Sequence, residues 1–381
     1  MSVEMSVPEI RFKGYSENWS IEKFKNVTKI NQGLQIEISS RYTQKVENSY
    51  FYITNEFLKE GSDYKYYIVN PPVSVLCDVD DVLMTRTGNT GHVVTNISGA
   101  FHNNFFKIKF DKKKLDKNFI VHYLKWSKTQ KIILRSAGSS TIPDLNHNDF
   151  YNIEIAYSKI EEQTAIGNTF QKLDSLINQH QQKHDKLSNI KKAMLEKMFP
   201  KQGKTIPEIR FKGFSEDWQE KELKEICTYH SSTLTVNDAE AEGKYELYDA
   251  QKCIGYTDRN IQDSDYITII KDGSGVGRVR VLPKNSSFIA TMGAIKPDES
   301  NLHFLYGCFI KIDFNKHISG ATIPHVYFRD YGREKFRVPT IEEQTSIGNY
   351  FQKLDALINQ HQQQITKLGN IKQACLSKMF V

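Results

Sequence analysis

The sequence contains few cysteines, and their arrangement suits neither a disulfide framework nor a zinc site. Its 381 residues include five cysteines, an odd number, and no two of them have the Cys-x-x-Cys spacing. Small secreted scaffolds and zinc knuckles depend on closely and regularly spaced cysteines. The sequence therefore predicts a protein of a reducing compartment with no metal site. The cysteines are Cys77, Cys227, Cys253, Cys308 and Cys375.

Long apolar runs and a strong excess of one charge are also missing. No run of about 18 apolar residues exists, and the first residues (MSVEMSVPEIRF) lack an apolar signal core. We therefore expect neither a membrane span nor a secretory signal, and predict a cytoplasmic protein. The 51 basic and 45 acidic residues give a net charge of +6, a weak indication of a nucleic-acid partner. The length predicts two or three domains.

Two stretches of the sequence occur twice. The peptide at residues 8–14 (PEIRFKG) returns at 207–213, and each copy leads to a tryptophan, Trp19 or Trp218. Residues 159–200 match residues 340–381 at 30 of 42 positions, and both copies contain Ile-Glu-Glu-Gln. The first insert (28–158) and the second insert (227–339) hardly match each other. Arrays of small repeats have much shorter periods, so the chain consists of two different inserts held by two nearly identical frames.

The repeated stretch that follows each insert predicts a long helix with a coiled-coil seam. Its seam residues recur at alternating steps of three and four, the spacing of a heptad repeat. No proline interrupts residues 161–199, so the first helix spans roughly 58 Å at about 1.5 Å per residue. The seam includes Phe170, Leu173, Ile177, His180 and Leu187 in the first copy and Phe351, Leu354, Ile358, His361 and Leu368 in the second.

Two packings are open to these helices. The first helix leads from one insert to the other, so the simplest packing sets the two helices side by side and antiparallel, with one insert at each end. A parallel coiled coil between two chains is the alternative. His180 and His361 occupy equivalent seam positions, where histidines either fix the register or hold a metal ion, and we favour the register.

Both inserts are predicted to be mainly β. Short stretches rich in β-branched and aromatic residues predict strands at 50–54, 81–85 and 105–110, and at 266–270, 278–282 and 304–312. Residues 119–133 have apolar residues at helical spacing and predict the one good helix of the first insert. The predicted fold is therefore α+β, with two mainly β domains, two long antiparallel coiled-coil helices and a pseudo-two-fold internal repeat.

Each insert has a glycine-rich loop after a predicted strand, TRTGNTG at 85–91 and KDGSGVG at 271–277. A loop that binds a nucleotide phosphate opens into a helix. Both of these loops lead into β-like sequence, so we predict hairpin turns. They are either plain tight turns or loops whose side chains contact DNA phosphates and base edges. The candidate DNA-contacting residues are Thr85, Arg86, Thr87, Asn89 and His92 in the first insert and Lys271, Ser274, Arg278 and Arg280 in the second.

A Thr-Ile-Pro tripeptide near the end of each insert extends the duplication. It lies at 141–143 and at 322–324, and each proline precedes the Ile of Ile-Glu-Glu-Gln by 17 residues. Asp144 then aligns with His325, and Asn148 aligns with Arg329. Different side chains at equivalent positions are expected if the two inserts contact different DNA sequences through equivalent surfaces. They are equally expected from neutral drift. His325 and Arg329 join the DNA-contacting candidates.

Residues Asn70, Pro71, Pro72 and Val73 resemble the Asn-Pro-Pro-aromatic motif of adenine methyltransferases. In that motif the aromatic ring stacks on a flipped base. Val73 has no aromatic ring, and no strand–glycine–helix cofactor site accompanies the motif. The sequence therefore predicts no catalytic residues, and these four residues are interpreted as a chance turn.

The doubled order of the PEIRFKG peptide, a tryptophan, a variable β-rich insert, Ile-Glu-Glu-Gln and a long helix resembles the DNA-specificity subunit of Type I restriction–modification enzymes. The resemblance covers essentially the whole chain. It implies that each insert reads one half of a bipartite, asymmetric site on double-stranded DNA, while the helices set the spacing. It also implies two methyltransferase subunits that bind S-adenosylmethionine, motor-nuclease subunits that use ATP, and no cofactor or catalytic activity in this chain.

The expected domains follow the repeat. They are a first target-recognition domain at 1–158 with its frame at 8–27, a central spacer helix at 159–200, a second target-recognition domain at 201–339 with its frame at 207–226, and a C-terminal spacer helix at 340–381. Two other functions remain open. A self-contained DNA adenine methyltransferase would bind its own cofactor, and a structural coiled-coil protein would show no DNA-dependent assembly.

Overall fold

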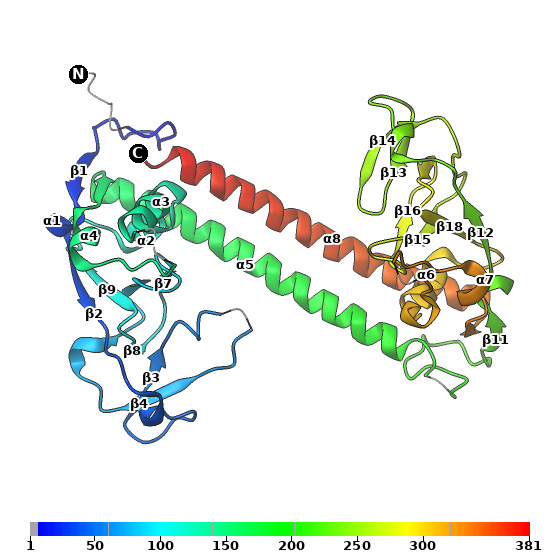
Figure 1. The fold of residues 1–381 in the computed structure, drawn as a ribbon, viewed down its shortest axis with the longest axis horizontal. Helices are drawn as coiled ribbons and strands as arrows, with labels where there is room; N and C mark the ends of the chain where they lie inside the picture. The colour runs from blue at the N-terminus through cyan, green and yellow to red at the C-terminus, as the bar shows by residue number, and fades with distance from the viewer. Residues whose placement is uncertain (1–6, 60, 139–140, 202, 321) are drawn as a thin grey trace. The chain divides into compact units, whose positions relative to one another are not determined.

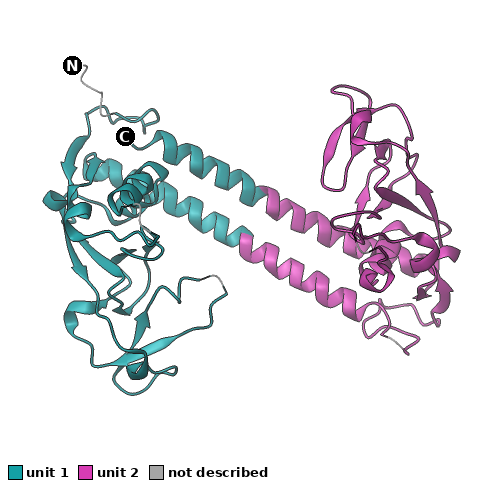
Figure 2. Ribbon diagram, viewed as in Figure 1, with its two compact units in different colours: residues 1–180, 364–381 teal, residues 181–363 magenta. Residues whose placement is uncertain are grey.

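The computed structural model describes residues 7–59, 61–138, 141–201, 203–320 and 322–381. The chain divides into two compact units (Figure 2). Unit 1 consists of residues 1–180 and 364–381, and unit 2 consists of residues 181–363. Each unit contains one insert, one copy of the frame peptide and part of both long helices, so the predicted α+β class is confirmed.

The first insert, with the frame residues that lead into it, folds into two small sheets, a further pair of strands (β1-β10) and several short helices (Figure 1). One sheet is antiparallel with the order β2-β9-β6-β7, and the other has the order β4-β3-β8-β5 with β3 and β8 parallel. The elements are β1 (Ser20–Lys23), α1 (Phe24–Val27), β2 (Thr28–Gln32), η1 (Ile38–Ser40), β3 (Ser49–Ile53), β4 (Tyr66–Val69), η2 (Val73–Val75), β5 (Leu76–Cys77), β6 (Val82–Thr85), β7 (Val93–Val94), β8 (Gly99–Phe101), β9 (Phe105–Phe110), α2 (Lys117–Lys125), α3 (Ser127–Ser136), α4 (His147–Asn152) and β10 (Glu154–Tyr157).

The second insert, with the frame residues that lead into it, has a similar architecture, with three strands instead of four in its smaller sheet and the strand pair β11-β19. Its antiparallel sheet has the order β12-β18-β15-β16, and its smaller sheet has the order β14-β13-β17 with β13 and β17 parallel. The elements are β11 (Gln219–Glu222), η3 (Leu223–Glu225), β12 (Cys227–Ser231), η4 (Val236–Asp238), β13 (Tyr245–Tyr248), β14 (Cys253–Thr257), β15 (Tyr266–Ile270), β16 (Val279–Leu282), β17 (Ser286–Phe288), β18 (Met292–Pro297), α6 (Leu302–Ile310), η5 (Phe314–His317), α7 (Phe328–Tyr331) and β19 (Lys335–Val338).

Five of the six predicted strands are strands, but two predictions for the inserts were wrong. Residues 304–312, predicted as a strand, fall largely in helix α6, whose N-cap Asn301 accepts hydrogen bonds from the backbone N–H groups of His303 and Phe304. Periodicity could not identify this helix because it is apolar and buried on most sides. Residues 119–133 form two helices because Trp126, with φ −65° and ψ 136°, ends α2 and begins α3. Its buried indole packs 5.7 Å from the ring of Phe380.

The long helices α5 (Ile160–Lys197) and α8 (Ile341–Lys378) pack against each other in both units. In unit 1 the ring of Phe170, early in α5, stacks 5.7 Å from that of Phe380, just past the end of α8. In unit 2 the order is reversed, and Phe199, just past α5, lies 6.2 Å from Phe351, early in α8. The predicted antiparallel pairing within one chain is therefore confirmed.

The PEIRFKG peptide at 8–14 or 207–213, called the frame peptide, contacts both long helices in each unit. In unit 1 the guanidinium of Arg11 forms two hydrogen bonds with Glu162 in the first turn of α5, at 2.6 and 2.8 Å. The Glu162 side chain is 1% exposed. The backbone N–H of the neighbouring Ile10 donates to the carbonyl of Lys378 at the end of α8. One short peptide thus binds the start of one helix and the end of the other.

Unit 2 repeats this arrangement with the helices exchanged. Arg210 forms the same two hydrogen bonds with Glu343 of α8, at 2.7 and 2.8 Å, and Ile209 donates to the carbonyl of Lys197 at the end of α5. The sequence repeats of the PEIRFKG peptide and of Ile-Glu-Glu-Gln are therefore explained by one contact. The second Glu of Ile-Glu-Glu-Gln is the partner of the frame arginine.

A glycine in each long helix lets a short helix of the insert approach closely. A Cβ at position 167 would lie 2.7 Å from the Cβ of Asn118, and one at position 348 would lie 2.1 Å from Oδ1 of Asn301. The glutamine of the Ile-Glu-Glu-Gln motif completes this contact. Gln163 Oε1 accepts from the N–H of Asp116 at 3.0 Å, and Gln344 Oε1 accepts from that of Asn301 at 3.1 Å.

Replacing Glu162 by glutamine should destabilise unit 1 strongly. The change leaves the buried Arg11 without its counter-charge, and breaking a buried ion pair on one side costs about 3–5 kcal/mol. Urea unfolding of the full chain, followed by circular dichroism, would measure the loss. Glu161→Gln is the matched control, because Glu161 is the exposed neighbour on the same helix turn. Equal stability of the two variants would contradict this role.

The buried His122 should make the fold sensitive to mild acid. Burial lowers the pKa of His122 to about 4, and the nearby Asp174 carboxylate only partly opposes this shift. An unfolded histidine has a pKa of about 6.5. As the pH falls from 6.5 towards 4, the unfolded chain binds a proton that the folded chain does not, and stability is lost.

We expect the free energy of unfolding to fall by roughly 1–2 kcal/mol between about pH 7 and pH 5 because of this residue. His122→Gln should reduce that difference, whereas His230→Gln, at an exposed position, should not. Urea unfolding at both pH values tests the expectation. An unchanged pH dependence in His122→Gln would show that other groups cause the acid sensitivity.

Candidate nucleic-acid interface

Both glycine-rich loops are hairpin turns, as predicted. The loop at 85–91 joins β6 to β7, and the loop at 271–277 joins β15 to β16, and both strand pairs are antiparallel. The N–H of Gly91 donates to the carbonyl of Thr85, and that of Gly277 donates to the carbonyl of Ile270, each at 2.8 Å. Both glycines have a φ between 84° and 89°, which favours glycine.

The residues after each Thr-Ile-Pro tripeptide lie against these loops. In unit 1 the N–H of Leu145 donates to the carbonyl of Arg86 at 2.8 Å, and Asp144 bridges to Thr87. In unit 2 the N–H of Val326 donates to the carbonyl of Lys271 at 2.9 Å. There His325 bridges to Asp272. The two loops are therefore held by the same backbone contacts, although the inserts hardly match in sequence.

A pair of acidic and basic side chains accompanies each of these backbone contacts. The two units differ in which member of the pair belongs to the loop. In unit 1 the loop supplies the base, because Arg86 Nη2 lies 2.8 Å from Asp144 Oδ2. In unit 2 the loop supplies the acid, because Asp272 Oδ1 lies 2.8 Å from Nδ1 of His325. Arg86 also donates to the carbonyl of Leu145, and its side chain is only 15% exposed. The Arg86 side chain thus holds its loop against the residues that follow the Thr-Ile-Pro tripeptide.

The other candidates of unit 1 differ in accessibility. Thr85 is fully buried, and its hydroxyl donates to the carbonyl of Asn89. Thr87 is half-buried, and its carbonyl accepts from Asn55 Nδ2 at 3.0 Å. Asn89 and His92 are exposed. Burial, and then the charge of Lys125, lower the pKa of His92. The accessible side chains of this loop are therefore those of Asn89 and His92.

In unit 2 the loop tip exposes Ser274 and Arg278. Arg278 Nη2 donates to the carbonyl of Ala250 at 3.1 Å. Arg280 is more enclosed: it donates to the carbonyls of Gln251 and Asp249, and burial lowers its pKa. Lys271 lies beside Asp272, with Nζ 3.4 Å from Oδ2. This loop therefore presents a hydroxyl and a guanidinium where the loop of unit 1 presents an amide and an imidazole.

Sequence reasoning missed an aromatic side chain in unit 2. Tyr327 is 43% exposed, and its ring stacks 6.2 Å from that of His325. The guanidinium of Arg329 lies 4.7 Å from the same ring. The structure thus brings both Thr-Ile-Pro candidates of unit 2 together around a tyrosine, an arrangement that suits stacking on bases. The signal available in the sequence was an aromatic residue, Tyr327, between the basic residues His325 and Arg329.

Unit 1 carries exposed tyrosines of its own, which were also missed. Tyr42, Tyr50 and Tyr64 are between 44% and 65% exposed. The guanidinium of Arg41 lies 5.5 Å from the ring of Tyr66, which stacks on Tyr64. Aromatic residues that alternate with basic ones over 41–66 were the signal. They belong to the smaller sheet of the first insert and its connections, away from the glycine-rich loop in sequence.

The seam residues lie on the inner sides of the long helices. Phe170, Phe351 and Leu354 are buried within the cores of their units. Leu173, Ile177, His180, Leu187, Ile358, His361 and Leu368 are half-buried. His180 belongs to unit 1 and His361 to unit 2. In the part of the chain that the structure describes, no three His, Cys, Asp or Glu side chains gather as metal ligands.

The Asn-Pro-Pro-Val stretch consists of the surface turn after β4 and the first residue of η2. Val73 is 83% exposed, and Asn70 has a φ of 48°. An exposed valine offers no platform for a flipped base. Over the described ranges, no helix has both the length and the apolar character needed to cross a membrane.

Comparison with known proteins gives a consistent result. The Type I restriction enzyme MjaVIII specificity subunit of Methanocaldococcus jannaschii is 24% identical over 219 residues, which cover 56% of this chain and 50% of that protein. A protein of the same organism, named as an MjaX specificity subunit, is 22% identical over 387 residues, with 90% and 88% covered. The crystal structure of a Type I restriction–modification S subunit from M. genitalium has the same fold, with a TM-score of 0.77, 19% identity and coverage of 98% and 99%.

The family model for the Type I restriction modification DNA specificity domain matches residues 16–189 and 215–368. These two ranges include both inserts, both frame tryptophans and most of both long helices. The chain therefore belongs to the family of the Type I restriction modification DNA specificity domain and is a non-catalytic specificity subunit.

Proposed function

We propose that this chain binds double-stranded DNA for a Type I restriction–modification complex, and that each insert reads one half of a bipartite, asymmetric site. The observation that carries the proposal is the equivalence of the two loops. The same backbone bonds hold both loops beside the Thr-Ile-Pro segments, yet Asn89 and His92 are presented in one unit and Ser274 and Arg278 in the other. One scaffold with two sets of side chains suits the reading of two different sequences.

The outer faces of the long helices support docking of two copies of one partner. Residues 171–182 and 352–363 are identical except at Ser175 and Ala356. The identical residues include exposed leucines, Leu176 and Leu357, which are 41% and 43% exposed. Core packing does not constrain exposed side chains, so their identity indicates a shared external contact. Exposed leucines on such a face suit a protein interface.

These partners are two methyltransferase subunits that bind S-adenosylmethionine. Motor-nuclease subunits that use ATP complete the complex, and the long helices set the spacing between the half-sites. Neither cofactor binds to this chain. The complex acts on the DNA of the cytoplasm, where a reducing environment suits the five free cysteines.

The charge of the inserts indicates that this chain alone binds DNA weakly. The first insert has 16 basic and 13 acidic residues, and the second has 14 of each. Phosphate neutralisation supplies much of the affinity of DNA-binding proteins. We therefore assign a large share of the phosphate contacts to the methyltransferase subunits.

Exchange of the first insert tests the proposed division of reading. Replacing residues 28–158 by the equivalent insert of a relative should change one half of the methylated sequence and leave the other half intact. Sequencing of modified adenines in cells that carry the exchanged chain gives the result. The reciprocal exchange of residues 227–339 is the control, and it should change the other half. A simultaneous change in both halves would contradict independent reading.

The reversed side-chain pairs predict how Arg86 acts. If Arg86 holds its loop through Asp144, Arg86→Ala and Asp144→Ala should weaken DNA binding by the assembled complex to a similar extent, about 1–2 kcal/mol. The double variant should add little further, because both changes remove one contact. Binding is measured by titration of a labelled duplex that contains the methylated site. Weaker binding in Arg86→Ala with unchanged binding in Asp144→Ala would indicate that Arg86 contacts DNA directly.

A further inference from the structure

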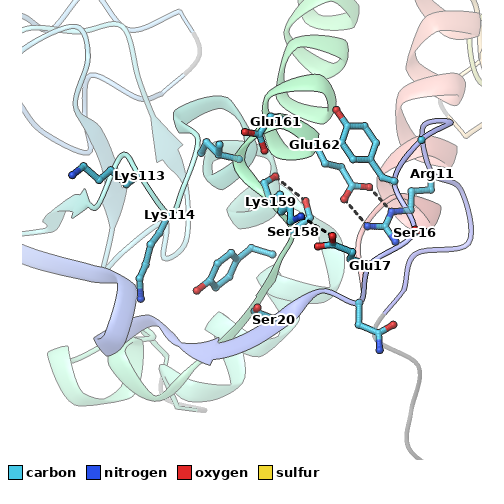
Figure 3. A pocket seen from close by; sticks show the side chains of 15 residues that line it. Arg11, Ser16, Glu17, Ser20, Lys113, Lys114, Ser158, Lys159, Glu161 and Glu162 are labelled. Carbon is cyan, nitrogen blue, oxygen red and sulfur yellow. Dashed lines mark hydrogen bonds and ion pairs between the residues drawn. The ribbon is translucent and has the colours of Figure 1, made fainter.

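Each unit has a cleft where its long helix begins. The cleft of unit 1 has a volume of about 850 Å³ and lies between the frame peptide, the residues before α2 and the start of α5. Figure 3 shows Lys113 and Lys114 on one side of it, Arg11 and Glu17 on the other, and Ser158 and Lys159 between them. The cleft of unit 2, about 250 Å³, is lined by the corresponding segments before α6 and α8.

The two clefts can be compared position by position because the same contacts fix their walls. Asp116 and Asn301 are the N-caps of α2 and α6, and each donates its backbone N–H to the glutamine of an Ile-Glu-Glu-Gln motif. Lys113 therefore corresponds to Asp298, and Lys114 corresponds to Glu299. The frame repeat and the helix repeat align the remaining wall residues.

The clefts carry opposite charge. Six equivalent positions of the walls or their rims differ in charge, and together they carry a net charge of +2 in unit 1 and −3 in unit 2. Five of the six positions are more negative in unit 2. The sixth, Glu22 in unit 1 and Lys221 in unit 2, is more positive there. The six are Asn18, Glu22, Asn26, Lys113, Lys114 and Lys159 in unit 1 and, in the same order, Asp217, Lys221, Glu225, Asp298, Glu299 and Thr340 in unit 2.

We infer that the cleft of unit 1 docks an acidic segment of the methyltransferase subunit and that the cleft of unit 2 repels the same segment. The inference rests on the proposed docking of two methyltransferase subunits on the two frames. Both methyltransferase subunits then make the same contacts along the identical helix surfaces. Only the subunit that docks on unit 1 also meets an attractive charge. The two methyltransferase subunits bind with unequal affinity, and the tighter site belongs to unit 1.

A protein segment fits the cleft of unit 1 better than the DNA backbone does. Duplex DNA carries one negative charge per 1.7 Å or so of its axis. A continuous line of phosphates along this cleft would meet the carboxylates of Glu17 and Glu161, which share its walls with the lysines. A short acidic segment can place single carboxylates beside Lys113 and Lys114 and avoid both glutamates. Lys114 and Lys159 lie 3.7 and 2.6 Å from carboxylates of Glu22 and Glu17, but their side chains are 47% and 65% exposed. An ammonium group has three donors, so both lysines keep donors for such contacts.

The full chain and its own methyltransferase subunit provide the test. Stepwise binding is followed by native mass spectrometry and calorimetry at low and high salt. In the wild type, the two steps should differ by about tenfold at low salt and converge at high salt, because exposed charges are screened. Lys113→Glu with Lys114→Glu should weaken the tight step by about tenfold, and Asp298→Lys with Glu299→Lys should tighten the weak one.

The matched control is Lys128→Glu with Lys131→Glu, the same charge change at exposed positions of α3 outside the cleft. Circular dichroism checks the folding of each variant. Equal steps that neither cleft variant alters would overturn the inference and leave the proposed docking intact. Weaker duplex binding by the assembled complex, with unchanged methyltransferase binding, would overturn it in favour of a phosphate site. Failure of the wild type to bind any methyltransferase subunit would overturn the proposed docking itself.

Discussion

The buried pair between the frame arginine and the second glutamate of Ile-Glu-Glu-Gln is the contact on which each unit depends. Arg11 and Glu162 form a two-pronged ion pair in unit 1, and Arg210 and Glu343 form it in unit 2. A carboxylate that is 1% exposed needs such a partner, because an unpaired buried charge is costly. The pair also has a topological effect. It fixes a peptide that precedes each insert against the helix that follows it, so both ends of an insert are held at one place.

This constraint explains why the inserts can differ while the frames cannot. The strand before each insert pairs with the strand at its end, β1 with β10 and β11 with β19. An insert therefore begins and ends at adjacent points, and its sequence can change without moving the helices. The frames have no such freedom, since one peptide must fit the start of one helix and the end of the other. Sequence identity is accordingly concentrated in the frames.

Local patterns made the frames predictable, whereas contacts between distant residues were not predictable. Heptad spacing identified both long helices, and glycines between strand-like stretches identified both hairpins. The common strand order of the two inserts was missed because it depends on pairings such as β3 with β8, which local sequence does not encode. The same limit applies to Arg86. Its sequence neighbours suggested a DNA contact, which stays a prediction, but they did not reveal its partner Asp144, which lies 58 residues away.

The duplication shows how to separate charges that act inside the chain from charges that act outside it. At the glycine-rich loops Asp144 is replaced by His325 while Thr87 is replaced by Asp272, and a side-chain pair at 2.8 Å is kept in both units, so this change is balanced internally. At the two clefts, Lys114 and Glu22 likewise become Glu299 and Lys221. The changes from Lys113 to Asp298 and from Lys159 to Thr340 have no counter-change among the residues that line the clefts. Lys159 pairs with Glu17 at 2.6 Å in unit 1, but unit 2 keeps the acid as Glu216 and loses the base, so the net charge of the cleft changes. Under the proposed function, the loops present different side chains to DNA on a common scaffold, and the clefts present opposite charges to the methyltransferase subunit.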